Sequence, residues 1–164
     1  MPRLLLFLSV PLYLLDQVTK FWIVANFPLR GPGKVIIKDF FTVHHIDNTG
    51  IAFGQFNQGA YSNYIFGAVA IGALILFASL YRKGMFPGAL SRVAIALLAA
   101  GVCGNFTDRL VHHYVVDFLS FDLHVPFANP WPSFNIADAC VVTAASLLAI
   151  ASFKEPVPAR KPKA

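Results

Sequence analysis

The stretch YIFGAVAIGALILFASLY, residues 64–81, is an unbroken run of 18 residues that contains no charged side chain. Folded as an α-helix, it would be about 27 Å long, which is close to the thickness of the hydrocarbon core of a bilayer. Apolar runs of this length are typical of transmembrane helices. The sequence therefore predicts a membrane span at this position.

Three further segments have a similar character, and polar residues interrupt each of them towards one end. They are expected to span the membrane at about residues 4–25, 90–110 and 135–153. Of all 164 residues, 57% are hydrophobic and 13% are charged, whereas soluble domains contain roughly 25% charged residues. The predicted fold class is an all-α membrane protein with four transmembrane helices. These helices are expected to belong to a single membrane domain, residues 1–154.

The basic residues indicate how this domain is oriented. If the four spans alternate in direction, most of the basic residues lie on one side of the membrane. The positive-inside rule makes that side cytoplasmic. The basic residues on that side are Arg3, Arg82, Lys83, Arg92, Lys154, Arg160, Lys161 and Lys163. Both termini are therefore predicted to be cytoplasmic, although Arg30, Lys34 and Lys38 fall on the other side. Residues 155–164 are expected to form a flexible basic cytoplasmic tail that is attracted to anionic phospholipid.

A cleaved signal peptide is an alternative interpretation of the N-terminus, because Arg3 precedes the apolar run at residues 4–15. Asp16 and Gln17 follow this run, where a cleavage site would require small residues. We therefore expect the first span to be retained.

Two extracytoplasmic segments connect the predicted spans. The first contains a turn at residues 31–33 and many β-branched and aromatic residues at 35–46, so a small β-rich loop domain is expected at about residues 30–58. The aromatic residues Phe53, Phe56 and Tyr61 are expected to form a lip at headgroup depth. The second segment covers residues 111–133.

Two aspartates, Asp117 and Asp138, stand at the extracytoplasmic edge of the predicted bundle, where an unpaired carboxylate is costly. They are 21 residues apart, and the proline-rich turn between them allows their carboxyl groups to meet. Two carboxyl groups that meet share one proton. The ionised member would then take a proton from water while the protonated member polarises a scissile carbonyl, which is the chemistry of an aspartic hydrolase.

Two other interpretations remain open on these residues alone. The polar side chains could form a purely structural network, in which Asp16 pairs with Lys20 and Asp138 caps the last helix. They could also form a proton or cation path in a small channel or transporter. A channel requires polar residues through the full depth of the bundle, whereas residues 93–100 and 144–153 are nearly all apolar.

Five short strings carry a resemblance to a known family. They are LLDQVTK at residues 14–20, NTGIAFG at 48–54, GNFTDRL at 104–110, VVDFL at 115–119 and FNIADA at 134–139. In this order and spacing, the chain resembles the lipoprotein signal peptidase family, also called signal peptidase II, over about residues 10–150. The resemblance implies an aspartic endopeptidase that removes signal peptides from diacylglyceryl-modified bacterial prolipoproteins by cutting before the lipidated cysteine.

The same resemblance implies the site and its surroundings. Asp117 and Asp138 match the catalytic dyad, and the supporting or substrate-binding positions are matched by Asn48, Gly50, Asn105, Arg109, Asn135, Asp16 and Asp108. Of these, Asp16 and Asp108 are expected to be mainly structural. The protein would lie in the bacterial cytoplasmic (inner) membrane with its active site near the outer leaflet, contact membrane phospholipid and be inhibited by globomycin. No cofactor, metal or nucleic-acid partner is expected.

The chain departs from the family pattern at a few positions. Ile51 stands where the family usually has alanine, and Cys103 and Cys140 replace residues of other types. Cys140 is two residues from Asp138, but no histidine lies near it in the sequence to activate a thiol. We therefore expect Cys140 to be a small buried apolar residue.

Overall fold

The structure is a computed structural model that describes residues 2–50, 62–85, 88–126 and 129–154. Several expectations fall outside these ranges. They concern Ile51, the aromatic lip of Phe53, Phe56 and Tyr61, and the tail at residues 155–164.

The helices occupy the segments in which spans were predicted. A short helix α1 (Pro2–Leu4) and a π-helical turn η1 (Leu5–Ser9) lead into α2 (Val10–Asn26), and the later helices are α3 (Ser62–Arg82), α4 (Ala89–Val111) and α5 (Ile136–Lys154). Pro11 follows the π-helical turn and lacks an N–H for the regular α-helical ladder.

Three segments among the described residues are long and apolar enough to cross a membrane, namely Leu5–Asn26, Ala89–Val111 and Ile136–Lys154. The described apolar part of α3 is shorter, Gly67–Arg82. The protein is thus a membrane protein built of helices, while a count of four spans remains a prediction.

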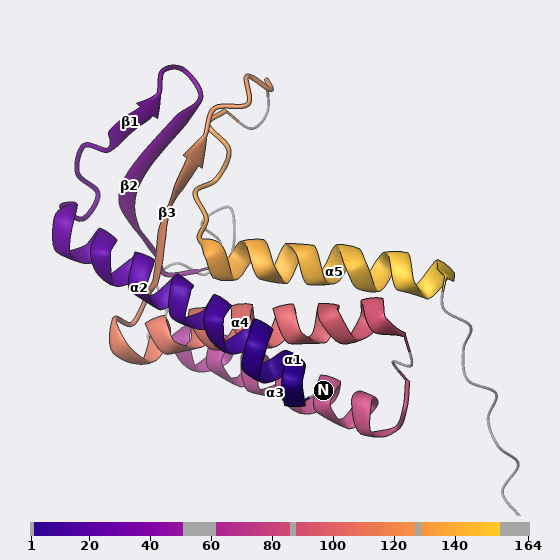
Figure 1. Cartoon of the computed structure of the whole chain (residues 1–164). Coiled ribbons are helices and arrows are strands. Elements are labelled where there is room, and N and C mark those ends of the chain that lie inside the picture. The colour runs from indigo at the N-terminus through magenta and orange to yellow at the C-terminus, as the bar shows by residue number, and fades with distance from the viewer. Residues whose placement is uncertain (1, 51–61, 86–87, 127–128, 155–164) are drawn as a thin grey trace, which may run out of the picture.

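Helix α4 lies at the centre of the bundle, and α2, α3 and α5 each pack against it (Figure 1). Its contact with α5 is close because small residues line it. A Cβ atom at Gly101 would lie 2.4 Å from the carbonyl oxygen of Ala137, and one at Gly104 would lie 3.0 Å from the Ala137 Cβ. Small residues let helix backbones approach in this way in membranes, where lipid tails are as apolar as leucine.

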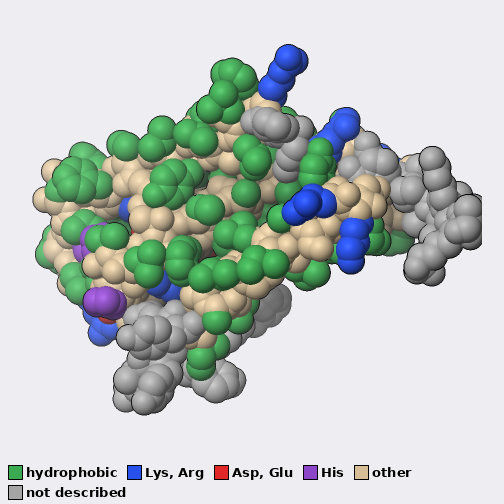
Figure 2. All heavy atoms as spheres, turned by 90° about the horizontal axis from the view of Figure 1, so that it is seen from below, with side chains coloured by type: hydrophobic (Ala, Val, Ile, Leu, Met, Phe, Trp, Pro, Cys, Tyr) green, Lys and Arg blue, Asp and Glu red, His purple; other side chains and the backbone are tan. Residues whose placement is uncertain are grey.

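The outer surface of the helices is largely apolar. Phe21 is 76% exposed and Val142 is 65% exposed, although both lie on helices, and Figure 2 shows hydrophobic side chains spread over the face seen there. A helix whose outward face is this apolar suits a hydrocarbon environment rather than water.

A three-stranded antiparallel sheet rises from one end of the bundle (Figure 1). Strands β1 (Lys34–Ile37) and β2 (Phe41–Asn48) come from the first loop and confirm the short strands expected there. The third strand, β3 (Val115–Phe121), pairs with β2 and comes from the segment between α4 and α5.

The predicted fold class was therefore incomplete, because it confined β-structure to the first loop of an otherwise all-α protein. The segment VVDFLSF is rich in residues that favour β-structure, but its apolar and polar residues do not alternate regularly. In the structure most side chains of β3 are buried on both faces of the strand, so alternation is not required. Its pairing is also non-local. Asp117 lies opposite Ile46 on β2, and Leu119 bridges Phe134 on its other side.

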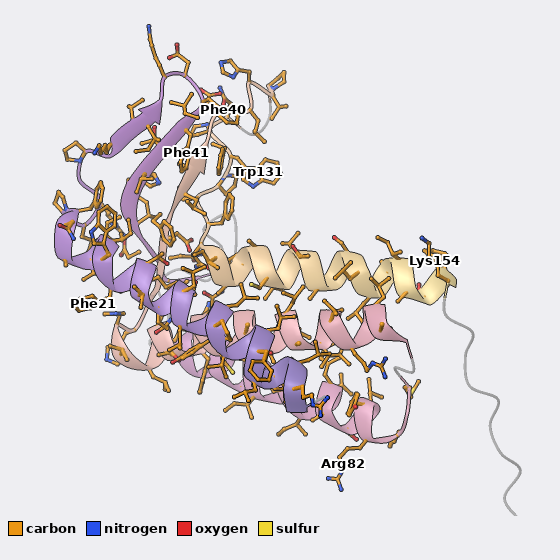
Figure 3. The ribbon with its side chains drawn as sticks, viewed as in Figure 1. Phe21, Phe40, Phe41, Arg82, Trp131 and Lys154 are labelled. Carbon is orange, nitrogen blue, oxygen red and sulfur yellow. The ribbon has the colours of Figure 1, made fainter. Side chains whose placement is uncertain are left out.

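The two ends of the molecule differ in chemistry. Figure 3 shows Phe40, Phe41 and Trp131 at the end that carries the sheet, and Arg82 and Lys154 at the opposite end of the helices. The predicted orientation assigns the end with Arg82 and Lys154 to the cytoplasm.

Candidate active site

The start of α5 places Asp138 and fixes its orientation. Asn135 precedes the helix, and its side-chain Oδ1 accepts a hydrogen bond from the backbone N–H of Asp138 at 2.8 Å. In return, Asp138 Oδ2 accepts a hydrogen bond from the backbone N–H of Asn135 at 3.3 Å. This reciprocal arrangement is a capping box, and it puts the carboxylate at the positive end of the helix dipole.

The same asparagine also holds Asp117. Because the Asn135 Oδ1 atom is engaged by a backbone donor, its NH2 group must point the other way. The NH2 group donates to Asp117 Oδ1 at 2.8 Å and to Asn105 Oδ1 at 3.1 Å. Asn135 is fully buried, so one rigid side chain joins the two aspartates that the sequence singled out.

Two further asparagines complete the hydrogen bonds of these carboxyl groups. Asn105 Nδ2 donates to Asp138 Oδ1 at 2.6 Å, and Asn48 Nδ2 donates to Asp117 Oδ2 at 3.0 Å. The backbone N–H of Gly50 donates to Asn48 Oδ1 at 3.2 Å and so orients that amide. Each of the four carboxyl oxygens therefore accepts an amide N–H, and the donors are Asn105 on α4, Asn48 on β2 and Asn135 just before α5.

A buried ion cluster lies beside this pair. Lys20 Nζ is 2.9 Å from Asp16 Oδ2 and 2.9 Å from Asp108 Oδ2, and it donates to Asn105 Oδ1 at 3.0 Å. The three charged side chains of this cluster are each at most 2% exposed. An ion pair at this depth is retained only with good geometry and satisfied hydrogen bonds, which this cluster has.

The two carboxylates of the ion cluster also hold the backbone next to the candidate dyad. Asp16 Oδ1 accepts from the N–H of Ala137 at 2.8 Å, and Asp108 Oδ2 accepts from the N–H of Val116 at 2.9 Å. Ala137 precedes Asp138 and Val116 precedes Asp117. Asp16 and Asp108 thus each bind the backbone N–H of the residue before a member of the candidate dyad, while their mainly structural role stays a prediction.

Arg109 is the remaining residue of the expected set. Its Nη1 donates to the backbone oxygen of Asn105 at 3.1 Å, one turn earlier on α4. The residue is half-buried on the helix that carries Asn105 and Asp108. The structure thus gathers all nine expected residues into one connected region.

Sequence reasoning missed two participants. Lys20 was predicted only to pair with Asp16, and Gln17 was noted only as a polar residue after the first apolar run, with no role in the site. Gln17 Nε2 donates to Asp16 Oδ2 at 3.1 Å and to Asp108 Oδ1 at 3.2 Å. The available signal was the run of three polar residues, Asp16, Gln17 and Lys20, inside an apolar helix.

The two cysteines lie on the helices that carry the site, Cys103 on α4 and Cys140 on α5. Cys140 is buried, as expected for a small apolar position, and Cys103 and Cys140 are both free thiols. Within the ranges that the structure describes, no group of three His, Cys, Asp or Glu side chains is arranged to hold a metal ion.

Burial gives Asp117 an unusual affinity for a proton. The side chain is 2% exposed, and loss of hydration raises its pKa from 3.8 to about 7, with the negative charge of Asp138 acting in the same direction. The hydrogen bonds from Asn48 and Asn135 and the charge of Lys20 oppose this increase. Near neutral pH the carboxyl group of Asp117 is thus able both to hold and to release a proton.

This pKa predicts how stability depends on pH. A carboxyl group whose pKa is higher in the folded than in the unfolded state favours folding at low pH, and its contribution is lost as the pH rises from about 4 to about 7. The difference between 3.8 and about 7 is worth at most about 4 kcal/mol. We expect the wild-type melting temperature in detergent to fall over this range by more than that of Asp117→Asn. Equal pH dependence in both proteins would contradict the increased pKa.

Several known proteins are similar to this chain. A family model described as Signal peptidase (SPase) II matches residues 8–154. The lipoprotein signal peptidase of Psychromonas ingrahamii is 34% identical over 161 residues, which cover 96% of this chain and 90% of the relative. That of Shewanella amazonensis is 37% identical over 146 residues, covering 88% of this chain and 84% of the relative.

Solved structures are also similar over nearly the full length. A bacterial membrane enzyme determined by the in meso method at 2.3 Å resolution has a TM-score of 0.81 and 28% identity, covering 98% of this chain and 93% of that one. A second one, at 1.9 Å resolution, has a TM-score of 0.80 and 30% identity, covering 93% and 94%. Residues 8–154, which the family model matches, include every element that contributes to the site described above.

Proposed function

Because this chain belongs to the signal peptidase II family, the lipoprotein signal peptidases, it is a membrane peptidase, and we propose that Asp117 and Asp138 form its catalytic dyad. The observation that carries this proposal is the shared hydrogen bonding through Asn135, whose NH2 group binds Asp117 while its backbone N–H and Oδ1 bind Asp138. Two carboxyl groups joined in this way in a buried site are able to share a proton.

The proposed reaction is hydrolysis by an activated water molecule. With its pKa raised to about 7, Asp117 is assigned the shared proton, and Asp138 is assigned the role of the base. The base takes a proton from water as the oxygen attacks the scissile carbonyl carbon, while Asp117 donates a hydrogen bond to the carbonyl oxygen. The C–N bond then breaks, and the nitrogen of the leaving amine receives the proton taken from water.

The supporting residues would keep this geometry through the reaction. Asn48 and Asn105 each donate to an oxygen of the dyad, on Asp117 and Asp138 respectively. A dyad whose oxygens are already hydrogen-bonded needs little reorganisation when charge moves between them, which is the basis of electrostatic preorganisation. Arg109, on the same helix as Asn105, is assigned to positioning the substrate backbone.

We propose diacylglyceryl-modified bacterial prolipoproteins as substrates, cut just before the lipidated cysteine. The site joins β3 to the start of α5, which lie at the end of the bundle that carries the sheet (Figure 1), and Figure 3 shows Arg82 and Lys154 at the opposite end. In the orientation predicted from the basic residues, this end faces the outer leaflet of the cytoplasmic membrane, and both termini are cytoplasmic. A lipid-anchored scissile bond would lie at that depth, surrounded by membrane phospholipid.

A proton or cation channel is less well supported by the same residues. Residues 139–153 of α5 contain no charged side chain, and neither do residues 93–104 of α4. The polar network is therefore confined to one end of these two helices, which suits a pocket rather than a path across the membrane.

The proposed function is tested by cleavage of a defined substrate. Purified protein in detergent is mixed with a diacylglyceryl-modified prolipoprotein, and with a matched precursor whose lipobox cysteine is replaced by serine and which carries no lipid. We expect cleavage of the lipidated precursor alone, immediately before the modified cysteine by mass spectrometry, and inhibition by globomycin. Equal cleavage of both precursors, or cleavage at another bond, would contradict the proposed substrate.

A further inference from the structure

Lys20 is a buried cation that contacts neither member of the proposed dyad. Its side chain is 2% exposed, and its partners are Asp16, Asp108 and Asn105, at 2.9, 2.9 and 3.0 Å. A lysine ammonium group has three N–H donors. All three are therefore accounted for inside the protein, which leaves Lys20 no direct contact to offer a substrate.

Carboxyl groups outnumber cationic side chains around the dyad. Four carboxyl groups lie in this region, on Asp16, Asp108, Asp117 and Asp138, and the cations among the described neighbouring residues are Lys20 on α2 and Arg109 on α4. Two further titratable groups interact with the ion cluster: Tyr114, just before β3, with Asp108, and the Cys140 thiol on α5 with Asp16. Strand β2 contributes the neutral Asn48. The charge of Lys20 thus offsets part of the negative charge that surrounds the dyad.

Lys20 also acts on the dyad through Asn105. The Asn105 Oδ1 atom accepts from Lys20 at 3.0 Å and from Asn135 at 3.1 Å, so its NH2 group must face Asp138, to which it donates at 2.6 Å. Without the ammonium group, the Asn105 amide would lose one of the two contacts that fix this orientation. The contact is specific, because an ammonium group cannot donate to an amide NH2.

We propose that Lys20 is a positioning residue that neutralises Asp16 and Asp108, so that the site's one shared proton stays on the dyad and Asp138 stays ionised. This inference rests on the proposed function, since it presumes that Asp117 and Asp138 perform the chemistry. If the charge of Lys20 were removed, Asp16 and Asp108 would remain as uncompensated buried charges close to Asp138. Their repulsion would favour protonation of the base and so remove activity at the acidic end of the pH range.

Two substitutions that change the charge of the site in opposite directions test this role. Lys20→Met removes a positive charge, so the acidic limb of the pH profile of kcat/KM should move to higher pH by roughly one unit. Asp108→Asn removes a negative charge while Lys20 remains, so the same limb should move to lower pH. A residue that serves only for packing would change kcat without moving the limb in either direction.

Controls separate charge from shape. Lys20→Arg keeps the positive charge, so it should leave the limb in place even if the larger guanidinium group lowers kcat. Lys34→Met removes an exposed charge on β1 and should leave the profile unchanged.

The inference is overturned if Asp108→Asn leaves the limb in place or moves it to higher pH, and this result is decisive even if Lys20→Met fails to fold. It is also overturned if a folded Lys20→Met keeps the wild-type profile. Failure of the proposed function would be seen separately, as full activity of Asp117→Asn or Asp138→Asn.

Discussion

Replacing Asp117 or Asp138 by asparagine is expected to lower kcat for prolipoprotein cleavage by at least about 10³-fold. Asparagine has nearly the shape of aspartate, but its amide neither takes a proton from water nor holds a proton between two carboxyl groups. General acid–base catalysis contributes about 10² to 10⁴-fold, and residues that act as a unit lose most of their effect when either is removed. Single-turnover cleavage of the lipidated precursor, followed by gel shift or mass spectrometry, measures this loss.

Asp122→Asn provides the matched control. Asp122 directly follows β3 and its side chain is 36% exposed. Its Oδ1 atom accepts a hydrogen bond from the backbone N–H of His124 at 3.0 Å and lies 3.1 Å from the ring Nδ1 of the same residue, away from the site. We expect this variant to keep wild-type activity. If the melting temperatures of Asp117→Asn and Asp138→Asn remain close to that of the wild type, a loss of activity is due to chemistry. Retention of more than a tenth of the wild-type kcat by either variant would exclude that residue from the dyad.

Gly101→Ala is expected to destabilise the protein strongly, although it adds only one methyl group. The new Cβ atom would lie 2.4 Å from the carbonyl oxygen of Ala137 and 2.7 Å from a methyl carbon of Val141. The Ala137 oxygen belongs to the backbone and cannot rotate away, so α4 and α5 must separate. Overpacking of this kind costs about 1 to 3 kcal/mol. Because Ala137 lies beside Asp138, we also expect the cleavage rate to fall.

Gly72→Ala is the control for this prediction. It makes the same substitution in α3, where a Cβ atom would meet nothing within 4 Å. Alanine is the better helix former by about 1 kcal/mol, so this variant should be neutral or slightly stabilised. Thermal unfolding in detergent compares the two variants directly. A melting temperature for Gly101→Ala at or above that of Gly72→Ala would show that the close approach of α4 and α5 is not required.

Much of the site could be predicted because charge is rare in this chain. In an apolar helix, each retained carboxylate or amide signals a cost that some interaction must offset. Asp16, Asn105, Asp108 and Asp138 stood out for that reason, and the five ordered strings separated Asp117 and Asp138 from the others. The role of Lys20 was harder to predict. Its spacing of four residues from Asp16 on one helix already accounted for a buried lysine by a local ion pair, so nothing in the sequence indicated contacts with Asp108 and Asn105.

The sheet illustrates what could not be predicted. The strands β1 and β2 are close in sequence and were expected from their composition, but β3 lies 67 residues beyond β2, counted from Asn48 to Val115. Nothing local in VVDFLSF indicates that its partner is the first loop. Pairing over such a separation depends on the packing of α2 and α4, which brings the two loops to the same end of the bundle.

The sequence by itself determined the membrane environment, the approximate helices, the family and the identity of the polar residues, because apolar run length and ordered motifs are local properties. Only the tertiary structure decided how those residues are connected: that Asn135 binds both aspartates, that Asn105 is held by Lys20, and that Asp16 and Asp108 anchor the backbone before Asp138 and Asp117. Hydrogen-bond direction depends on which donor meets which acceptor in space. In this protein those donors and acceptors lie on α2, α4, β2, β3 and α5, so their pairing is a property of the folded chain.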